Sequence, residues 1–170
     1  ADALYAQTDI TVTPTVTSVQ NIDLTRVRGV EGELVATDVW IAGLDISASL
    51  ALNDAKTLRD RQYPSANGKV FPRIPNIRAS LFADYRFAPQ WDASLGIRHS
   101  GHQYGTLNNS DFVDTYGAVS RFTVVDAKLR WRFSPRWTAA LGVDNLTNAR
   151  YWVYHPYAGR TAFGQLRWEL

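Results

Sequence analysis

Aromatic and cationic side chains gather in the irregular stretches of the second half of the sequence, where they could bind a planar, negatively charged ligand. Tyrosine rings stack on planar groups, and Arg or His offsets negative charge. The candidates for ligand contact are Tyr104, Tyr116, Arg121, Tyr151, Tyr154, His155, Tyr157 and Arg160. A tyrosine near a strand end also commonly packs within a loop or at a membrane interface, so this second role stays open.

Residues that could support catalysis or metal binding are few. His99 and His102 lie three residues apart near the end of a strand, so their side chains point to opposite faces and cannot chelate one ion as a pair. Asp111 and Asp114 resemble the acidic groups of a protease, but loop carboxylates are usually solvated and the sequence offers no partner base. We therefore expect no enzyme activity, no metal site and no cofactor.

A sequence repeat predicts the elements that hold these residues. Residues 85–98 (YRFAPQWDASLGIR) and 131–144 (WRFSPRWTAALGVD) match at seven of fourteen positions, with an offset of 46 residues. Each copy runs an alternating segment into Phe-x-Pro-x-Trp and then into a second alternating segment. This pattern predicts two antiparallel hairpins with very short turns.

One face of each predicted strand is apolar and the other is charged. The apolar faces in the middle of the strands carry Ala79, Leu81, Ala83, Leu95, Ile97, Val125, Ala127, Leu129, Leu141 and Val143. Aromatic residues gather beside the turns and in the last strand: Tyr85, Phe87, Trp91, Trp131, Phe133, Trp137 and Trp168. Such banding is typical of a lipid-facing wall with an aromatic girdle at the membrane interface. A soluble sandwich would instead bury a core of mainly branched aliphatic residues.

The composition agrees with a membrane barrel. The chain contains no Cys, so neither a disulfide framework nor a thiol nucleophile is expected. No stretch approaches the roughly twenty apolar residues of a membrane helix. The net charge is only +2, with acidic and basic residues interspersed, which argues against nucleic-acid binding. The chain begins Ala-Asp-Ala and contains no Met, which we interpret as a mature product or a piece of a longer protein.

About eight strands are expected, joined alternately by short turns and long loops. The short turns are predicted at 37–43, 88–90 and 134–136, and the long loops at 54–73, 105–121 and 149–160. This alternation is typical of outer-membrane barrels, whose long loops lie outside the cell. Residues 44–53 and 161–170 are long enough to cross a bilayer as tilted strands.

Three segments resemble the C-terminal part of TonB-dependent outer-membrane receptors, the importers of ferric siderophores, cobalamin and related ligands. They are RGVEGEL (28–34), PRIPN (72–76) and VDNLTNARY (143–151), and their order and spacing also match. The chain then closes with GRTAFG (159–164) and a final alternating strand, as those receptors do. One departure is the end of the chain: such barrels usually finish on an aromatic residue, whereas here Leu170 follows Trp168.

The resemblance implies that residues 1–170 form the C-terminal third of a receptor barrel of about 22 strands. It also implies a multi-pass location in the outer membrane of a Gram-negative cell. Family members carry a plug domain, preceded by the short motif that contacts TonB, and the sequence contains neither. The implied partners are outer-membrane lipid, the remainder of the barrel, the plug, TonB through the absent N-terminal region, and a ferric siderophore or similar ligand.

A self-contained eight-stranded barrel with a structural, adhesive or enzymatic role is the alternative. Its interior would be just wide enough for side chains, so its inward charges would have to neutralise one another. These charges are Glu31, Glu33, Arg86, Lys128, Arg130, Arg132 and Arg167. In a larger receptor the same side chains would face a plug and water, which is easier to satisfy. Pairing between the first and last strands would identify the small barrel.

Overall fold

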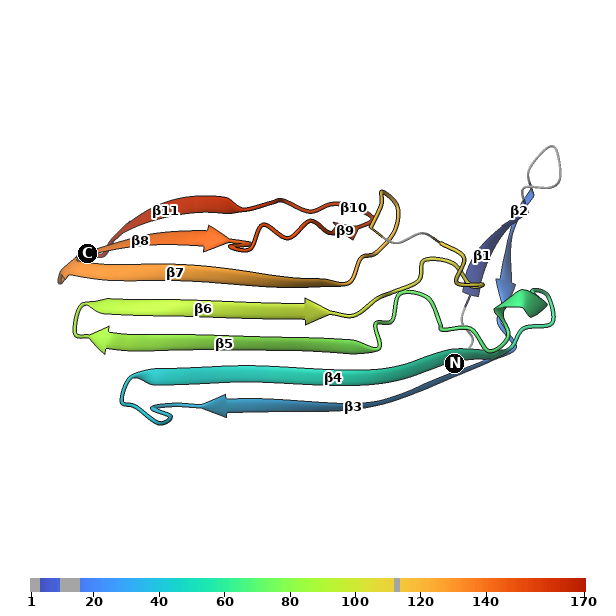
Figure 1. The fold of residues 1–170 in the computed structure, drawn as a ribbon, viewed down its shortest axis with the longest axis horizontal. Helices are drawn as coiled ribbons and strands as arrows, with labels where there is room; N and C mark the ends of the chain where they lie inside the picture. Colours follow the sequence, from blue (N-terminus) through green and yellow to red (C-terminus); the bar gives the residue numbers. More distant parts are fainter. Residues whose placement is uncertain (1–3, 10–15, 112–113) are drawn as a thin grey trace.

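The computed structural model describes residues 4–9, 16–111 and 114–170, which form an almost entirely antiparallel β-structure (Figure 1). Seven long strands make one sheet in the spatial order β11-β8-β7-β6-β5-β4-β3. Their bounds are β3 Leu24–Ala36, β4 Leu44–Arg59, β5 Ile77–Ala88, β6 Trp91–Ser100, β7 Phe122–Ser134, β8 Trp137–Asp144 and β11 Thr161–Trp168. The predicted all-β antiparallel fold is confirmed.

Smaller elements lie outside this sheet. The strands β1 (Leu4–Asp9) and β2 (Val16–Asn21) pair with each other, as do β9 (Trp152–Val153) and β10 (His155–Pro156). A 3₁₀ turn, η1, spans Pro64–Ala66. Figure 1 shows the β1–β2 hairpin beyond the ends of β3 and β4, near η1. Within the described ranges, no helix has the length and apolar character needed to span a membrane.

The connections between the long strands differ at the two ends of the sheet. Short turns join β3 to β4, β5 to β6 and β7 to β8 at what we call the short-turn end, as predicted. Long loops join the remaining neighbours at the opposite end, the long-loop end (Figure 1). The loop predicted from residue 54 begins later, because β4 continues to Arg59. The chain folds back there: the Thr57 N–H donates to the Lys69 carbonyl, and the Phe71 N–H donates to the Ala55 carbonyl.

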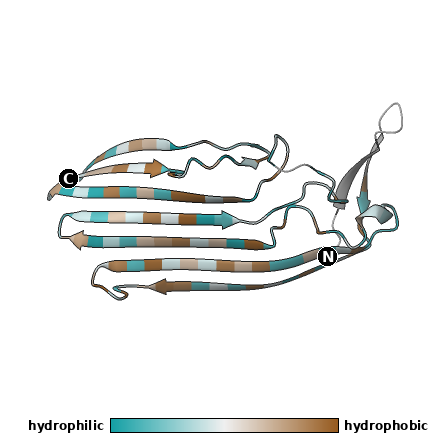
Figure 2. Ribbon diagram, viewed as in Figure 1, coloured by the Kyte–Doolittle hydropathy of each residue, from teal (hydrophilic) through white to brown (hydrophobic). Residues whose placement is uncertain are grey.

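In-register pairing gives the sheet one apolar face. Leu95 pairs with Ala83 on β5 and with Ala127 on β7, and Leu129 pairs with Leu141 on β8. Figure 2 shows the resulting alternation of hydrophobic and hydrophilic residues along the strands. This face is largely uncovered, since Leu141 is 70% exposed. A contiguous exposed apolar surface of this kind indicates contact with lipid or another apolar partner.

The seven residues of the predicted girdle form one unbroken chain of ring contacts along the short-turn end. The order is Tyr85, Phe87, Trp91, Trp131, Phe133, Trp137 and Trp168, with neighbouring ring centroids between 5.2 and 6.4 Å apart. The rings of Trp91 and Trp131 are nearly parallel, at 6° and 5.3 Å. The chain of rings crosses from β5 to β11, so aromatic packing ties the two predicted hairpins and the last strand together.

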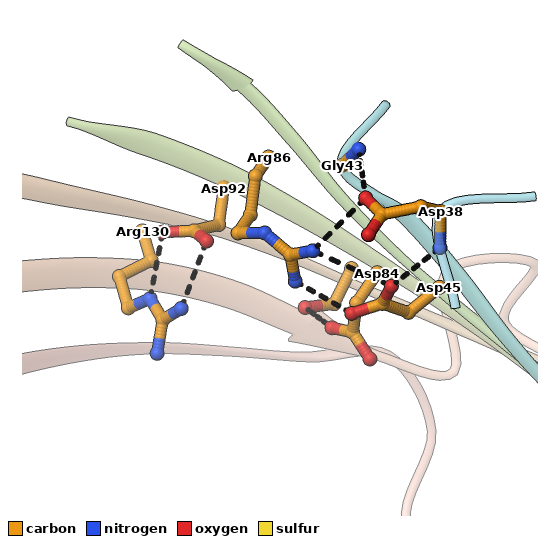
Figure 3. Close-up of polar contacts among 8 residues, drawn as sticks. Asp38, Gly43, Asp45, Asp84, Arg86, Asp92 and Arg130 are labelled. Carbon is orange, nitrogen blue, oxygen red and sulfur yellow. Dashed lines mark hydrogen bonds and ion pairs between the residues drawn. The ribbon is translucent and has the colours of Figure 1, made fainter. Parts of the chain in front are cut away.

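Ion pairs on the charged face, which we call the inner face, hold the short-turn end together (Figure 3). The guanidinium of Arg86 contacts Asp45 across the β4–β5 pair and lies 3.6 Å from Asp38 in the β3–β4 turn. Asp38 Oδ1 accepts a hydrogen bond of 2.7 Å from the N–H of Gly43, whose φ of +85° suits glycine. On the next pair of strands, Arg130 Nε donates a hydrogen bond of 3.0 Å to Asp92 Oδ2, and Arg130 Nη2 forms an ion pair of 2.9 Å with Asp92 Oδ1.

The sheet has two open edges. Among the described strands, β3 pairs only with β4, and β11 pairs only with β8. Within the described ranges, the first strands β1 and β2 pair with each other and not with the last strand. The described residues therefore do not show the first-to-last pairing expected of the self-contained eight-stranded barrel.

Glycines on the inner face make room for aromatic rings from neighbouring strands. A Cβ atom on Gly142 would overlap the ring of Phe163 on β11, whereas one on Gly164 would lie 3.5 Å from the nearest atom, in ordinary contact. The Gly142→Ala variant should therefore lose about 1–3 kcal/mol of unfolding free energy through overpacking. Gly164→Ala, on the apolar face beside Leu141 of the same strand pair, is the control and should stay close to the parent.

The measurement is urea unfolding of the detergent-solubilised protein, followed by tryptophan fluorescence. Equal midpoints for Gly142→Ala and Gly164→Ala would show that Phe163 does not occupy the space above Gly142.

Candidate ligand-binding site

Three loops converge at the long-loop end and bond to one another. Val119 forms isolated β-bridges with Gln103 in its own loop and with Val153 in the loop between β8 and β11. The backbone N–H of Arg73, from the β4–β5 loop, donates a hydrogen bond of 2.9 Å to the carbonyl of Tyr104. The three loops therefore form one layer that is connected by backbone hydrogen bonds.

This layer has a small core of its own. Val119 and Ser120 are 2% and 0% exposed. A separate cluster joins Ile22, Ala66 and Leu107, with Tyr63 and Phe71 packed against it. Ile22 follows β2 directly, so this cluster connects the end of the β1–β2 hairpin to two of the loops.

Asp111 closes the first part of the β6–β7 loop. Its carboxylate accepts hydrogen bonds from the N–H of Gly105 at 2.8 Å and from the hydroxyl of Thr106 at 2.7 Å. Burial raises the pKa of Asp111, but these hydrogen bonds outweigh it and the pKa lies below the ordinary value. Asp114, the other acidic candidate for catalysis, is exposed. Asp111 thus has a structural role in holding the loop.

Asn145 anchors the loop between β8 and β11. Its side-chain amide donates to the carbonyls of Ala149 at 2.9 Å and Ala158 at 3.3 Å, and its Oδ1 accepts from the N–H of Ala149 at 2.8 Å. Asn148 Oδ1 accepts a further hydrogen bond from the N–H of Arg160. The string VDNLTNARY therefore contains the two asparagines that fix both ends of the loop carrying the tyrosines.

Two side-chain pairs from three loops are joined at the neighbouring residues Tyr154 and His155. We call these four residues the aromatic cluster: Arg73, Tyr116, Tyr154 and His155. The rings of Tyr116 and His155 meet edge to face at 5.2 Å. The guanidinium of Arg73 lies 5.4 Å from the ring centroid of Tyr154. Tyr116 is 69% exposed. The cluster thus carries two phenol groups, an imidazole and a cation, and all of these residues except the half-buried Tyr154 are exposed.

Tyr151 has a different position. Its ring is stacked between Phe122 at 4.4 Å and Tyr157 at 4.8 Å, and the residue is only 6% exposed. Burial raises the pKa of its hydroxyl. Tyr151 therefore supports Tyr157, which is 56% exposed, and is itself poorly placed for ligand contact.

Among the described residues, the side chains of the remaining predicted ligand residues form no ring contact or ion pair with this cluster. Tyr104 packs edge to face against His102 at 4.4 Å. Arg121 and Arg160 are exposed and form neither a ring contact nor an ion pair with any described residue. The geometry thus brings together Tyr116, Tyr154 and His155, places Tyr157 on Tyr151, and leaves the other three separate.

Sequence reasoning missed Arg73 and Phe122 as parts of this region. Arg73 lies in the string PRIPN, which indicated only the family resemblance. No local sequence pattern predicts that its guanidinium lies over the ring of Tyr154, 81 positions later. Phe122 begins β7 and gave no sign of stacking on Tyr151.

The two imidazoles predicted near the end of β6 make separate contacts. His99 Nδ1 lies 2.8 Å from the Thr123 hydroxyl, while His102 packs on Tyr104. In the part of the chain that the structure describes, no three His, Cys, Asp or Glu side chains are grouped to hold a metal ion. The chemistry available at the aromatic cluster is stacking, hydrogen bonding and charge compensation.

The anchoring role of Asn145 gives a direct test. Asn145→Asp keeps the acceptor but removes both N–H donors, leaving the Ala149 and Ala158 carbonyls unpaired, so the loop should lose about 1–3 kcal/mol of local stability. Hydrogen exchange of the amides in 149–160 should accelerate accordingly. Asn108→Asp is the control, because Asn108 uses only its oxygen, which accepts from Ser110. Equal exchange rates in the two variants would contradict the anchoring role.

Comparisons with known proteins agree with this geometry. Residues 2–146 match the family described as TonB dependent receptor-like, beta-barrel. A curated relative, the probable TonB-dependent siderophore receptor PiuA of Acinetobacter baumannii, is 27% identical over 128 residues, covering 72% of this chain and 16% of the relative.

Solved structures share the fold. The siderophore receptor PiuA of Acinetobacter baumannii superposes with a TM-score of 0.67 and 23% identity, over 82% of this chain and 20% of that one. BauA, the ferric preacinetobactin receptor of the same organism, superposes with a TM-score of 0.71 and 18% identity, over 98% of this chain and 26% of BauA. The copper transporter OprC superposes with a TM-score of 0.67 and 20% identity, over 98% of this chain and 27% of OprC. The chain thus spans about a quarter or less of the length of these relatives, and the family match over most of its residues shows that it belongs to the TonB-dependent receptor β-barrel family.

Proposed function

We propose that this chain forms the C-terminal part of the wall of an outer-membrane receptor that takes up a ferric siderophore or a similar scarce chelate. The observation that carries the proposal is the uncovered apolar face of the sheet, bordered at the short-turn end by the chain of seven aromatic rings. Apolar bands flanked by aromatic girdles are the mark of barrels in lipid. The family supports the same placement, since TonB-dependent receptor barrels are outer-membrane proteins.

The inner face suits a large, occupied lumen. A hollow of about 540 Å³ on this face is lined by charged and polar side chains of β7, β8 and β11, including Lys128, Arg130, Arg132 and Arg167. Arg130 pairs with Asp92 and Arg167 with Glu169, whereas Lys128 and Arg132 pair with no described carboxylate. Their charges are easier to satisfy against a plug domain and water than inside a narrow closed barrel. The plug, the remaining strands and the region that contacts TonB belong, in this proposal, to parts of the receptor outside these residues.

Ligand contact is assigned to the aromatic cluster at the long-loop end. Its tyrosines can stack on the planar groups of a chelator, and Arg73 and His155 can offset negative charge. The relatives named above are described as receptors for siderophores or ferric preacinetobactin and as a copper transporter, which supports a metal chelate as the class of ligand.

The lipid-facing orientation can be tested with one inserted charge. Leu129 lies in the middle of the apolar face, paired with Ala93 and Leu141. Leu129→Arg should cost roughly 2–4 kcal/mol of folded-state stability in a bilayer. Ser94→Arg on the inner face is the control and should cost far less. The measurement is urea unfolding of the complete protein in phosphatidylcholine vesicles, and equal losses would contradict the assignment of the faces.

The proposed ligand site can be tested by truncating its loop. Replacing Tyr154, His155 and Tyr157 together with Ala should reduce uptake of a radiolabelled ferric siderophore about tenfold or more, because stacking and charge compensation are both lost. The amount of inserted barrel should not change. A control variant, Trp40→Ala with Ile41→Ala, removes exposed apolar side chains at the short-turn end instead.

The uptake measurement uses a panel of ferric chelates that includes ferric preacinetobactin, with the inserted protein quantified by immunoblot. Unchanged uptake of every chelate that the parent transports would remove this loop from the site. Absence of uptake by the parent, despite correct insertion, would refute the proposed ligand class.

A further inference from the structure

The outward face changes character abruptly at the long-loop end of β3 and β4. Val30 pairs with Leu52, and these residues are 75% and 46% exposed, so they belong to the uncovered apolar face. Two residues further along each strand, on the same face, Arg28 pairs with Asp54. The next pair on this face is Arg26 with Lys56. The cations Arg26, Arg28 and Lys56 thus lie directly beyond the apolar residues of this face. Successive pairs on the face are about 7 Å apart along the strands.

These cations surround a single carboxylate. Arg26 Nη2 lies 2.8 Å from Asp54 Oδ2, and Lys56 Nζ lies 3.3 Å from Asp54 Oδ1. Both oxygens of Asp54 are therefore engaged, and Arg28, although directly opposite, forms no ion pair with any described residue. The side chains of Arg26 and Lys56 remain 33% and 41% exposed. The group carries more positive charge than its carboxylate can neutralise, and Asp54 holds two of the cations in place.

We propose that Arg26, Arg28 and Lys56, which we call the basic collar, bind the phosphate group of an anionic membrane lipid whose acyl chains lie along Val30 and Leu52. The inference rests on the proposed placement of the apolar face in lipid. A phosphate oxygen accepts charge-assisted hydrogen bonds from Arg and Lys, and both side chains extend readily along an apolar surface toward headgroups. Basic residues immediately beyond the hydrocarbon boundary attract anionic lipid.

The position of the collar favours a lipid over a free anion or a protein. The apolar pair Val30 and Leu52 borders the charges on the membrane side, so a ligand with both a phosphate and an acyl chain matches both halves of the surface. The inner-face cations Lys128 and Arg132 have no such apolar border, because they point to the face of the sheet opposite the apolar residues.

The experiment uses the complete protein that carries these residues, reconstituted in phosphatidylcholine bilayers doped with phosphatidylglycerol. Native mass spectrometry after detergent extraction reports the fraction of molecules that retain phosphatidylglycerol. Arg28→Gln combined with Lys56→Gln should reduce this retention roughly 25-fold. Lys128→Gln combined with Arg132→Gln removes the same charge from the inner face and should leave retention unchanged. The swap Arg28→Lys with Lys56→Arg keeps both charges and should keep retention within about twofold of the parent.

Each alternative has its own result. Equal losses of phosphatidylglycerol retention in the collar and inner-face variants would show that net charge alone causes the effect, which would overturn the site. Unchanged retention in the collar variant would also overturn the site. Displacement of phosphatidylglycerol by excess inorganic phosphate would identify a free-anion site instead. Quenching of the girdle tryptophans by brominated lipid separates the proposed placement of the apolar face in lipid from the proposed basic collar. Absence of quenching would refute both proposals. Quenching together with unchanged retention of phosphatidylglycerol would refute the basic collar alone.

Discussion

In-register pairing of seven antiparallel strands is the constraint on which the rest of the structure depends. Because successive side chains point to opposite faces, a slip of one residue between any two strands would move a charged row onto the apolar face. At the short-turn end, the tight turns, the contact of Arg86 with Asp45 and the stacked rings of Trp91 and Trp131 oppose such a slip. The uncovered apolar face and the charged inner face are both consequences of that alignment.

The two ends of the sheet are built on different principles. The short-turn end is stabilised by contacts between neighbouring strands, so aromatic packing and ion pairs repeat there from pair to pair. The long-loop end is stabilised by contacts between loops, with asparagine and aspartate side chains replacing the backbone ladder where the strands stop. Asn145 and Asp111 are examples of this replacement. The first end holds neighbouring strands in register, and the second carries the aromatic cluster.

The sequence predicted the strands, the three short turns and the aromatic row well, because period-two alternation is a local property of each strand. It predicted the long-loop end poorly, because the contacts there join residues that are far apart in the sequence. The extension of β4 to Arg59 depends on hydrogen bonds with the returning loop, and alternation alone could not show it. The same holds for Arg73 on Tyr154, and for the burial of Tyr151 between Phe122 and Tyr157. Tyrosine identity alone did not distinguish a supporting ring from an accessible one.

The Trp91–Trp131 stack also bears on the order of folding. β5 with β6, and β7 with β8, are local hairpins, whereas β6 and β7 are separated by the long loop between Ser100 and Phe122. Closing that loop costs more chain entropy than forming either hairpin, so the hairpins are favoured to form first. The two tryptophans lie at the end of the β6–β7 ladder farthest from the loop. Their rings can stack only when the ladder has zipped along its whole length, which makes this stack an intrinsic marker of the final step in joining the two hairpins.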